Sequence, residues 1–143
     1  MSKSIKIQDI SKSYPGVKAN SNVSFDIDNA SIHAIVGENG AGKSTLMKIL
    51  YGMVKPDSGE IYVFDEKISL SSPKDAINYG LGMVHQHFML ADNFTVIESI
   101  ILGIDSAGIT NLKLEKYRDS INEVMNRYSL NVCLLYTSPS PRD

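Results

Sequence analysis

The chain has 143 residues, enough for one domain with a sizeable hydrophobic core. Hydrophobic residues make up 43% of it and charged residues 21%, as in ordinary globular proteins, and the net charge of −2 does not indicate a nucleic-acid partner. No apolar run approaches the roughly 18 residues of a membrane span, no secretory signal is visible, and a single cysteine excludes a disulfide framework, so we expect a cytosolic protein.

The first third of the chain predicts strands. Isoleucines separated by polar residues indicate a strand over residues 5–10, and the Ser-Tyr-Pro-Gly stretch at 13–16 then favours a turn. Apolar and polar residues alternate again over residues 23–27, which predicts a half-buried strand. The short apolar run 32–36 is typical of a strand buried on both faces.

The remaining elements alternate between helices and short strands. We predict a helix over residues 44–51, a hairpin of strands 61–64 and 67–70, and a short helix that Ser72 caps and that ends at Gly80. Residues 81–85 form a further strand candidate. Thr95 and Glu98 have the spacing of a capping box, and a second, amphipathic helix follows over 114–128. This order predicts an α/β fold class built of packed α and β layers.

Residues 37–45, Gly-Glu-Asn-Gly-Ala-Gly-Lys-Ser-Thr, fit the P-loop pattern G-x-x-x-x-G-K-[ST]. The glycines let the backbone curl so that its N–H groups point at phosphate oxygens, and the helix that follows adds its positive end. A chance glycine-rich turn is the alternative, but the preceding strand and following helix are the context that the motif needs. We therefore predict that nucleotide is bound by Gly37, Asn39, Gly40, Ala41, Gly42, Lys43, Ser44 and Thr45.

Within this set, two side chains have specific predicted roles. The ammonium group of Lys43 would reach the β- and γ-phosphates, and the hydroxyl of Ser44 would bind Mg²⁺.

Two strands and a Tyr-Pro-Gly turn precede this P-loop, an arrangement that resembles the nucleotide-binding domain of ABC transporters. Three further segments are similar to the family pattern, and the resemblance covers residues 5 to about 132. They are the adenine-stacking loop at 12–17, the segment after the first helix at 55–61, and the Q-loop at 83–86.

The resemblance implies that Tyr14 stacks on the adenine ring, although a turn aromatic packed on the first strand is the alternative. It also implies a catalytic role for Lys43 and for Gln86, whose side-chain carbonyl would bind Mg²⁺ or water and couple the nucleotide to a membrane partner. The alternative for Gln86 is a polar residue that ends a strand.

The stretch at 85–96, which begins His-Gln-His-Phe-Met-Leu, resembles the branch of the family that energises uptake of simple sugars and nucleosides, with wording closest to the nucleoside importers. Its apolar side chains either pack in the core or form an exposed cluster for a partner helix. The resemblance implies ATP and Mg²⁺ as cofactors and a peripheral location on the cytoplasmic face of the cell membrane. It also implies membrane permease subunits, a second nucleotide-binding domain and, indirectly, an extracytoplasmic solute-binding protein as partners.

The family's later motifs do not occur in this chain: a Leu-Ser-Gly-Gly-Gln signature, a Walker B strand ending in Asp-Glu, and a switch histidine. We therefore predict that residues 1–132 are the N-terminal part of a truncated nucleotide-binding domain, inactive by itself. A soluble P-loop NTPase or kinase without a membrane partner is the alternative function.

The last eleven residues, 133–143, change abruptly in composition and contain two prolines that suit no continuing helix. All eleven match one reading frame of a transposase-based sequencing adapter, so we predict that this tail is non-native and that a natural Pro-Ser linker is the alternative. A third hypothesis follows, in which the chain as written is an assembly product with no cellular function.

Overall fold

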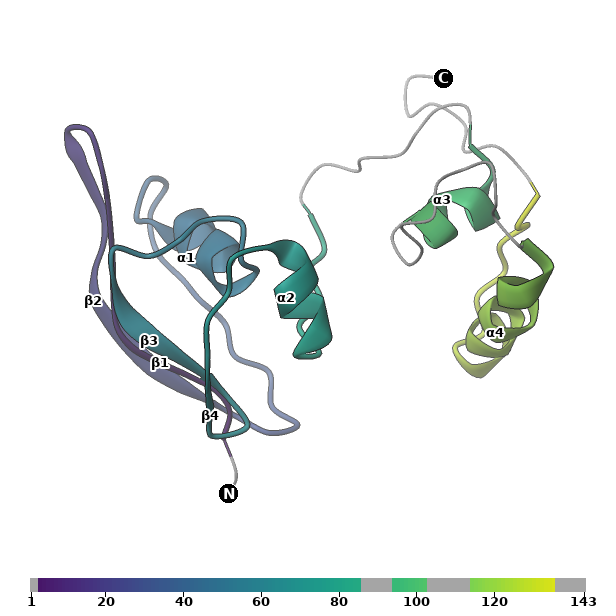
Figure 1. Cartoon of the computed structure of the whole chain (residues 1–143), viewed down its shortest axis with the longest axis horizontal. Helices are drawn as coiled ribbons and strands as arrows, with labels where there is room; N and C mark the ends of the chain where they lie inside the picture. The colour runs from purple at the N-terminus through teal and green to yellow at the C-terminus, as the bar shows by residue number, and fades with distance from the viewer. Residues whose placement is uncertain (1–2, 86–93, 103–113, 136–143) are drawn as a thin grey trace. The chain divides into compact units, whose positions relative to one another are not determined.

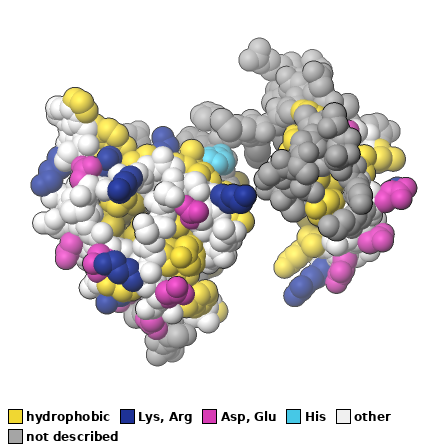
Figure 2. Space-filling model, viewed as in Figure 1, with side chains coloured by type: hydrophobic (Ala, Val, Ile, Leu, Met, Phe, Trp, Pro, Cys, Tyr) yellow, Lys and Arg dark blue, Asp and Glu magenta, His cyan; other side chains and the backbone are white. Residues whose placement is uncertain are grey.

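The computed structural model describes residues 3–85, 94–102 and 114–135 of the chain. The chain divides into two compact units, Met1–Val84 and His85–Asp143. Figure 1 shows a sheet packed against helices in the first unit and helices alone in the described part of the second. On the face of the first unit drawn in Figure 2, basic and acidic side chains are interspersed.

The first unit is built on a four-stranded antiparallel sheet of order β2-β1-β3-β4. Strands β1 (Lys3–Tyr14) and β2 (Val17–Asp28) form a long hairpin, and β3 (Ser58–Val63) and β4 (Glu66–Ile68) form a short one. The three strands predicted over 5–10, 23–27 and 61–64 are confirmed. The strand predicted at 67–70 ends earlier, at Ile68.

The β1–β2 hairpin is longer than predicted because β-bulges interrupt its alternation of apolar and polar residues. Asp9 and Asn22 adopt positive φ angles of 51° and 48°, and the hydroxyl groups of Ser24 and Ser11 accept hydrogen bonds from their backbone N–H groups at 2.8 and 2.9 Å. Gly59 fits against the bulge at Asp9 because a Cβ there would lie 2.6 Å from the carbonyl oxygen of Asp9.

Helices α1 (Lys43–Leu50) and α2 (Pro73–Asn78) cover one face of this sheet (Figure 1). The predicted helices over 44–51 and after Ser72 are therefore confirmed. Apolar side chains from the strands and both helices form one buried cluster: Ile7, Ile10, Leu46, Ile49, Ile61, Val63, Ile68, Leu70 and Ala76. This core fixes the position of α1, and with it the loop at the helix N-terminus.

The strands predicted over 32–36 and 81–85 do not form, and both predictions are wrong. Ile32 and Val36 are 101% and 91% exposed, and Val84 is 90% exposed. A strand needs a neighbouring strand that exchanges backbone hydrogen bonds with it, and within the described residues neither segment is paired with a strand of the sheet. Both segments instead lie along an apolar groove of about 370 Å³ against α1.

The second unit contains α3 (Val96–Leu102) and α4 (Leu114–Arg127), the two helices predicted for this part of the chain. The capping box is confirmed, because the hydroxyl and N–H groups of Thr95 donate to the Glu98 carboxylate at 2.7 and 2.8 Å. Leu134, inside the predicted tail, is buried against Ile97, whose N–H donates to its carbonyl at 3.1 Å. None of the helices that the structure describes is long and apolar enough to cross a membrane.

Candidate functional site

The loop at 37–42 curls tightly into the start of α1. Gly40 and Gly42 adopt left-handed conformations with φ angles of 86° and 85°, which glycine reaches without steric cost. The N–H of Ala41 donates to the carbonyl of Glu38 at 3.1 Å, and the carbonyl of Gly42 accepts the first hydrogen bond of the helix from Leu46 at 3.0 Å. The predicted P-loop residues therefore form one continuous turn.

Strand β2 holds this turn in place by direct contact. A Cβ on Gly42 would lie only 2.0 Å from the carbonyl oxygen of Ala19, so no larger residue fits there. The side chain of Asn20 is buried at 6% exposure, and its amide donates to the carbonyl of Gly42 at 3.3 Å. Sequence reasoning missed Asn20, because an isolated asparagine between Ala19 and Ser21 gives no signal of a contact with a residue 22 positions later.

The N-terminus of α1 has the properties of an anion site. Its N-cap residue, Gly42, provides no side-chain cap, and none of the side chains of the first turn is acidic. The first N–H groups of a helix have no acceptor inside the helix, and the aligned peptide dipoles make this end positive. An anion bound at this end would therefore receive hydrogen bonds from backbone N–H groups and a favourable field.

The ammonium group of Lys43 folds back over the same loop. It donates to the carbonyl of Gly37 at 2.6 Å and to the carbonyl of Glu38 at 2.7 Å. Both acceptors are uncharged, so these bonds leave the positive charge of the lysine unneutralised. The donor groups present, a fixed cation and a helix N-terminus behind a glycine turn, fit a polyphosphate chain.

The other predicted site residues differ in exposure, and one of them is not described by the structure. Asn39, Ala41 and Ser44 are exposed, and Thr45 is half-buried in the first turn of α1. Gln86 lies outside the described residues, as does most of the His-Gln-His-Phe-Met-Leu stretch. Among the described residues, no group of three or more histidine, cysteine or acidic side chains could hold a metal ion. In this part of the chain the magnesium prediction therefore depends on the Ser44 hydroxyl.

Tyr14 ends β1 and is 43% exposed at the tip of the hairpin, available to a flat partner. The ammonium group of Lys12 lies 5.7 Å from the centre of its ring, within the range of a cation–π contact. Lys12 is paired across the hairpin with Asn20, the residue that contacts the P-loop. One hairpin therefore carries both the tyrosine and the support of the loop.

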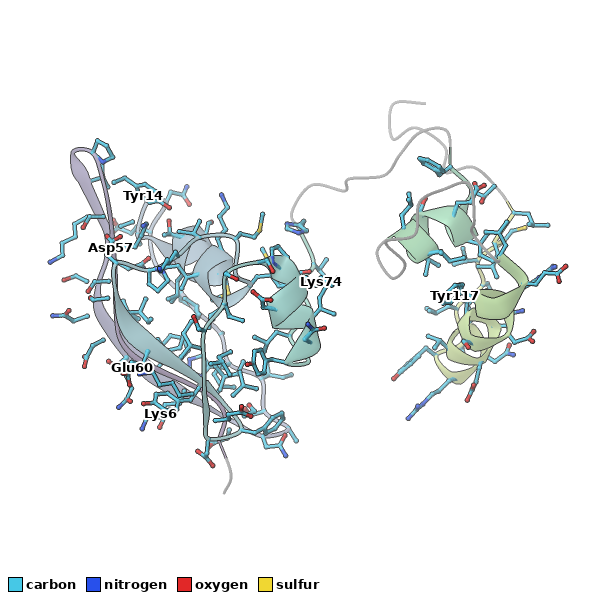
Figure 3. The ribbon with its side chains drawn as sticks, in the orientation of Figure 1. Lys6, Tyr14, Asp57, Glu60, Lys74 and Tyr117 are labelled. Atoms are coloured by element: carbon cyan, nitrogen blue, oxygen red, sulfur yellow. The ribbon has the colours of Figure 1, made fainter. Side chains whose placement is uncertain are left out.

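Asp57, in the turn before β3, is bonded to the same hairpin end (Figure 3). Its carboxylate forms an ion pair with Lys12 at 2.8 Å and accepts the N–H of Ser13 at 2.7 Å. The hydrogen bonds from Lys12 and Ser13 hold the pKa of Asp57 below its usual value, so the carboxylate is ionised at neutral pH.

Comparison with known proteins identifies named relatives of this sequence. It is 44% identical over 128 residues to the guanosine import ATP-binding protein NupO of Bacillus subtilis, and 46% identical over 128 residues to the nucleoside import ATP-binding protein NupA of Lactococcus lactis. Each match covers 90% of this chain and 25% of the relative. The chain therefore spans about a quarter of the length of these curated relatives.

Solved structures share the fold. A nucleotide-free ATP-binding cassette from an ABC transporter superposes with a TM-score of 0.77 at 23% identity, over 96% of this chain and 58% of that one. The ADP conformation of another ABC transporter cassette gives a TM-score of 0.79 at 22% identity, over 99% of this chain and 60% of that one. The sequence profile described as ABC transporter matches residues 20–138, most of the chain and all of its P-loop. The chain belongs to the ABC transporter family.

Proposed function

We propose that this chain is the N-terminal part of the ATP-binding subunit of an ABC importer, which couples ATP binding and hydrolysis to uptake of a nucleoside or simple sugar. The observation that carries the proposal is the Lys43 ammonium group, held over a glycine turn at an uncapped helix N-terminus. The names of the relatives, nucleoside and sugar import ATP-binding proteins, support the importer role.

In this proposal the P-loop binds the phosphates of ATP through backbone N–H groups, and Lys43 leaves its two carbonyl acceptors for the β- and γ-phosphates. That exchange replaces neutral acceptors with charged ones, and hydrogen bonds between ionised groups are the stronger kind. Tyr14 offers its exposed ring to the adenine base.

Mg²⁺ would be held by the Ser44 hydroxyl and by Gln86, together with phosphate oxygens. The bound ion supplies positive charge that stabilises the transferred phosphoryl group. Ser44 is exposed at the second position of α1, beside Lys43, so its hydroxyl lies at the same helix end as the lysine.

The subunit would act on the cytoplasmic face of the cell membrane, bound to permease subunits and paired with a second nucleotide-binding domain. Uptake would also involve an extracytoplasmic solute-binding protein, which would select the solute together with the permease. The rest of the gene distinguishes this proposal from the alternative of a soluble P-loop NTPase or kinase. A lid or guanine-reading motif there would favour the alternative.

The direct test of the site is titration of the intact subunit with ATP. Lys43→Ala should abolish binding, because the phosphates lose the cation that this loop provides. Lys48→Ala is the matched control, since Lys48 is exposed in the last turn of the same helix and should leave the affinity unchanged. Equal ATP affinity in the wild type and in Lys43→Ala would contradict the assignment.

A further inference from the structure

Asp57 connects the turn before β3 to the end of the β1–β2 hairpin at three points. Its carboxylate pairs with the Lys12 ammonium group at 2.8 Å and accepts the Ser13 N–H at 2.7 Å, and its own N–H donates to the Ser11 carbonyl at 2.9 Å. The residues bonded are three consecutive residues of β1, and Tyr14 is the next one along the chain.

These bonds lie where the sheet stops supporting the hairpin. The pairing of β1 with β3 ends at Ser11 opposite Ser58, and beyond that point β1 pairs only with β2. Tyr14 therefore lies on a two-stranded extension, and isolated two-stranded hairpins are at best marginally stable in water. On the β1 side, the carboxylate of Asp57 ties this extension back to the rest of the first unit at Lys12 and Ser13, whereas on the β2 side Asn20 contacts Gly42.

The same carboxylate also acts on the tyrosine ring through Lys12. The ammonium group that Asp57 binds lies 5.7 Å from the centre of the Tyr14 ring, so the ion pair fixes a cation beside that ring. On its other side the turn follows the end of α1, where the N–H of Met53 donates to the carbonyl of Lys48 at 2.8 Å. Asp57 thus lies between the helix that begins at the P-loop and the hairpin that presents Tyr14.

We infer that Asp57 is a positioning residue for adenine recognition, which holds the hairpin end so that the Tyr14 ring is placed for stacking above phosphates bound at α1. The inference rests on the proposed function. Asp57 touches no nucleotide in this account and acts only through Lys12, Ser13 and the tyrosine that follows them. Its loss should therefore weaken the contribution of the base to binding and leave the contribution of the phosphates unchanged.

The test compares two ligands, ATP and inorganic tripolyphosphate, on the intact subunit by calorimetric titration. Asp57→Ala should weaken ATP binding about 3- to 10-fold, because a freed hairpin must be ordered again on binding, and should leave tripolyphosphate binding unchanged. Asp57→Asn should give an intermediate loss, since the amide carbonyl still accepts the Ser13 N–H but forms no ion pair.

The matched control is Glu60→Gln. Glu60 lies on β3, and its carboxylate also pairs with a lysine, but that lysine, Lys67, belongs to β4 and not to the hairpin that carries Tyr14. Its substitution should alter neither affinity. Combining Asp57→Ala with Tyr14→Ala should cost no more ATP affinity than Tyr14→Ala alone, because the two residues then act as one unit.

Each other outcome overturns the inference in a recognisable way. Equal weakening of ATP binding and tripolyphosphate binding by Asp57→Ala would show a general structural role for Asp57. Unchanged ATP affinity in both Asp57 variants would show that Asp57 has no role in binding. Additive losses in the double variant would show that Asp57 acts independently of Tyr14. A wild-type subunit that binds neither ligand would refute the proposed function itself, and the inference with it.

Discussion

Gly42 combines a left-handed backbone conformation with close contact to a neighbouring strand. Its φ is 85°, and the space where a side chain would begin is occupied by the carbonyl of Ala19. Gly42→Ala should therefore destabilise the intact subunit by more than about 2 kcal/mol, since a left-handed alanine costs about 1–2 kcal/mol and the clash adds to it. Gly80→Ala is the control, because Gly80 has a φ of 80° with open space around it. Similar chemical-denaturation midpoints for the two variants would contradict the close approach.

The Tyr14 ring should contribute to binding through its face and not its hydroxyl. Tyr14→Ala should weaken ATP binding by about 1–3 kcal/mol, the usual value of base stacking, and Tyr14→Phe should change it little. The same calorimetric titration measures both variants. If the phenylalanine and alanine variants lose equal affinity, Tyr14 does not stack on the base.

For single residues, a site made of contiguous residues was predictable from the sequence, whereas contacts between residues far apart in the chain were not. The P-loop residues follow one another in the chain, so their spacing alone indicated the glycine turn that the structure forms at Gly40 and Gly42, with Lys43 folded back over it. Asn20 and Asp57 act across 22 and 44 or more residues, and nothing local to either marks its partner. The sequence showed Asp57 only as a turn residue.

Helix α2 is stabilised at its N-terminus by capping hydrogen bonds that involve Ser71, Ser72 and Asp75. The Ser72 hydroxyl accepts the Asp75 N–H at 3.3 Å, and the Asp75 carboxylate accepts the hydroxyl and N–H of Ser71 at 2.7 and 3.0 Å. Ser72→Ala should cost about 1 kcal/mol of local stability, which amide hydrogen exchange of α2 measures as several-fold faster exchange. Lys74→Ala, exposed on the same turn, should leave the exchange rates nearly unchanged.

The Asp75 cap also makes the stability of α2 depend on pH. The hydrogen bonds from Ser71 lower the pKa of Asp75 below its usual 3.8. Because the pKa is lower in the folded state, this carboxylate stabilises α2 fully above pH 3.8, and the stabilisation is lost as the pH falls through the lower folded value. Exchange of the α2 amides should accelerate in acid in the wild type and less so in Asp75→Asn. An equal acid response in both, after correction for intrinsic exchange, would contradict the cap.

The correctly predicted helices are marked by local sequence signals. The two predicted strands that do not form would have needed a neighbouring strand. Helix α1 follows the P-loop, α2 has a serine cap before proline, and α3 has a capping box. The segments 32–36 and 81–85 have strand composition, but a strand also needs a hydrogen-bonded partner. The hairpin β1–β2 exceeded its prediction because its bulges obscure the period-two pattern.

For the whole molecule, exposed apolar surface dominates the expected behaviour of the 143-residue chain. Ile32, Val36 and Val84 are at least 90% exposed, and an apolar groove of about 370 Å³ lies along α1. Exposed surface of this kind favours aggregation, and even complete domains have only about 5–15 kcal/mol of net stability.

We therefore expect the expressed chain to be poorly soluble or molten, to bind a hydrophobic dye such as ANS, and to show no ATPase activity above background. Thermal melting and phosphate release from the purified chain test this expectation. The matched control is the intact subunit, which should melt cooperatively and release phosphate. A sharp cooperative melt with measurable phosphate release from the 143-residue chain would contradict it.

We propose that residues 1–132 begin an importer ATPase whose remaining motifs lie further along the gene. Independent resequencing of the locus tests it most directly. We expect a reading frame that continues past Val132 without the Cys133–Asp143 tail and encodes Leu-Ser-Gly-Gly-Gln followed by an apolar strand ending in Asp-Glu. A frame that retains the tail and stops at Asp143 in an independent library would contradict it.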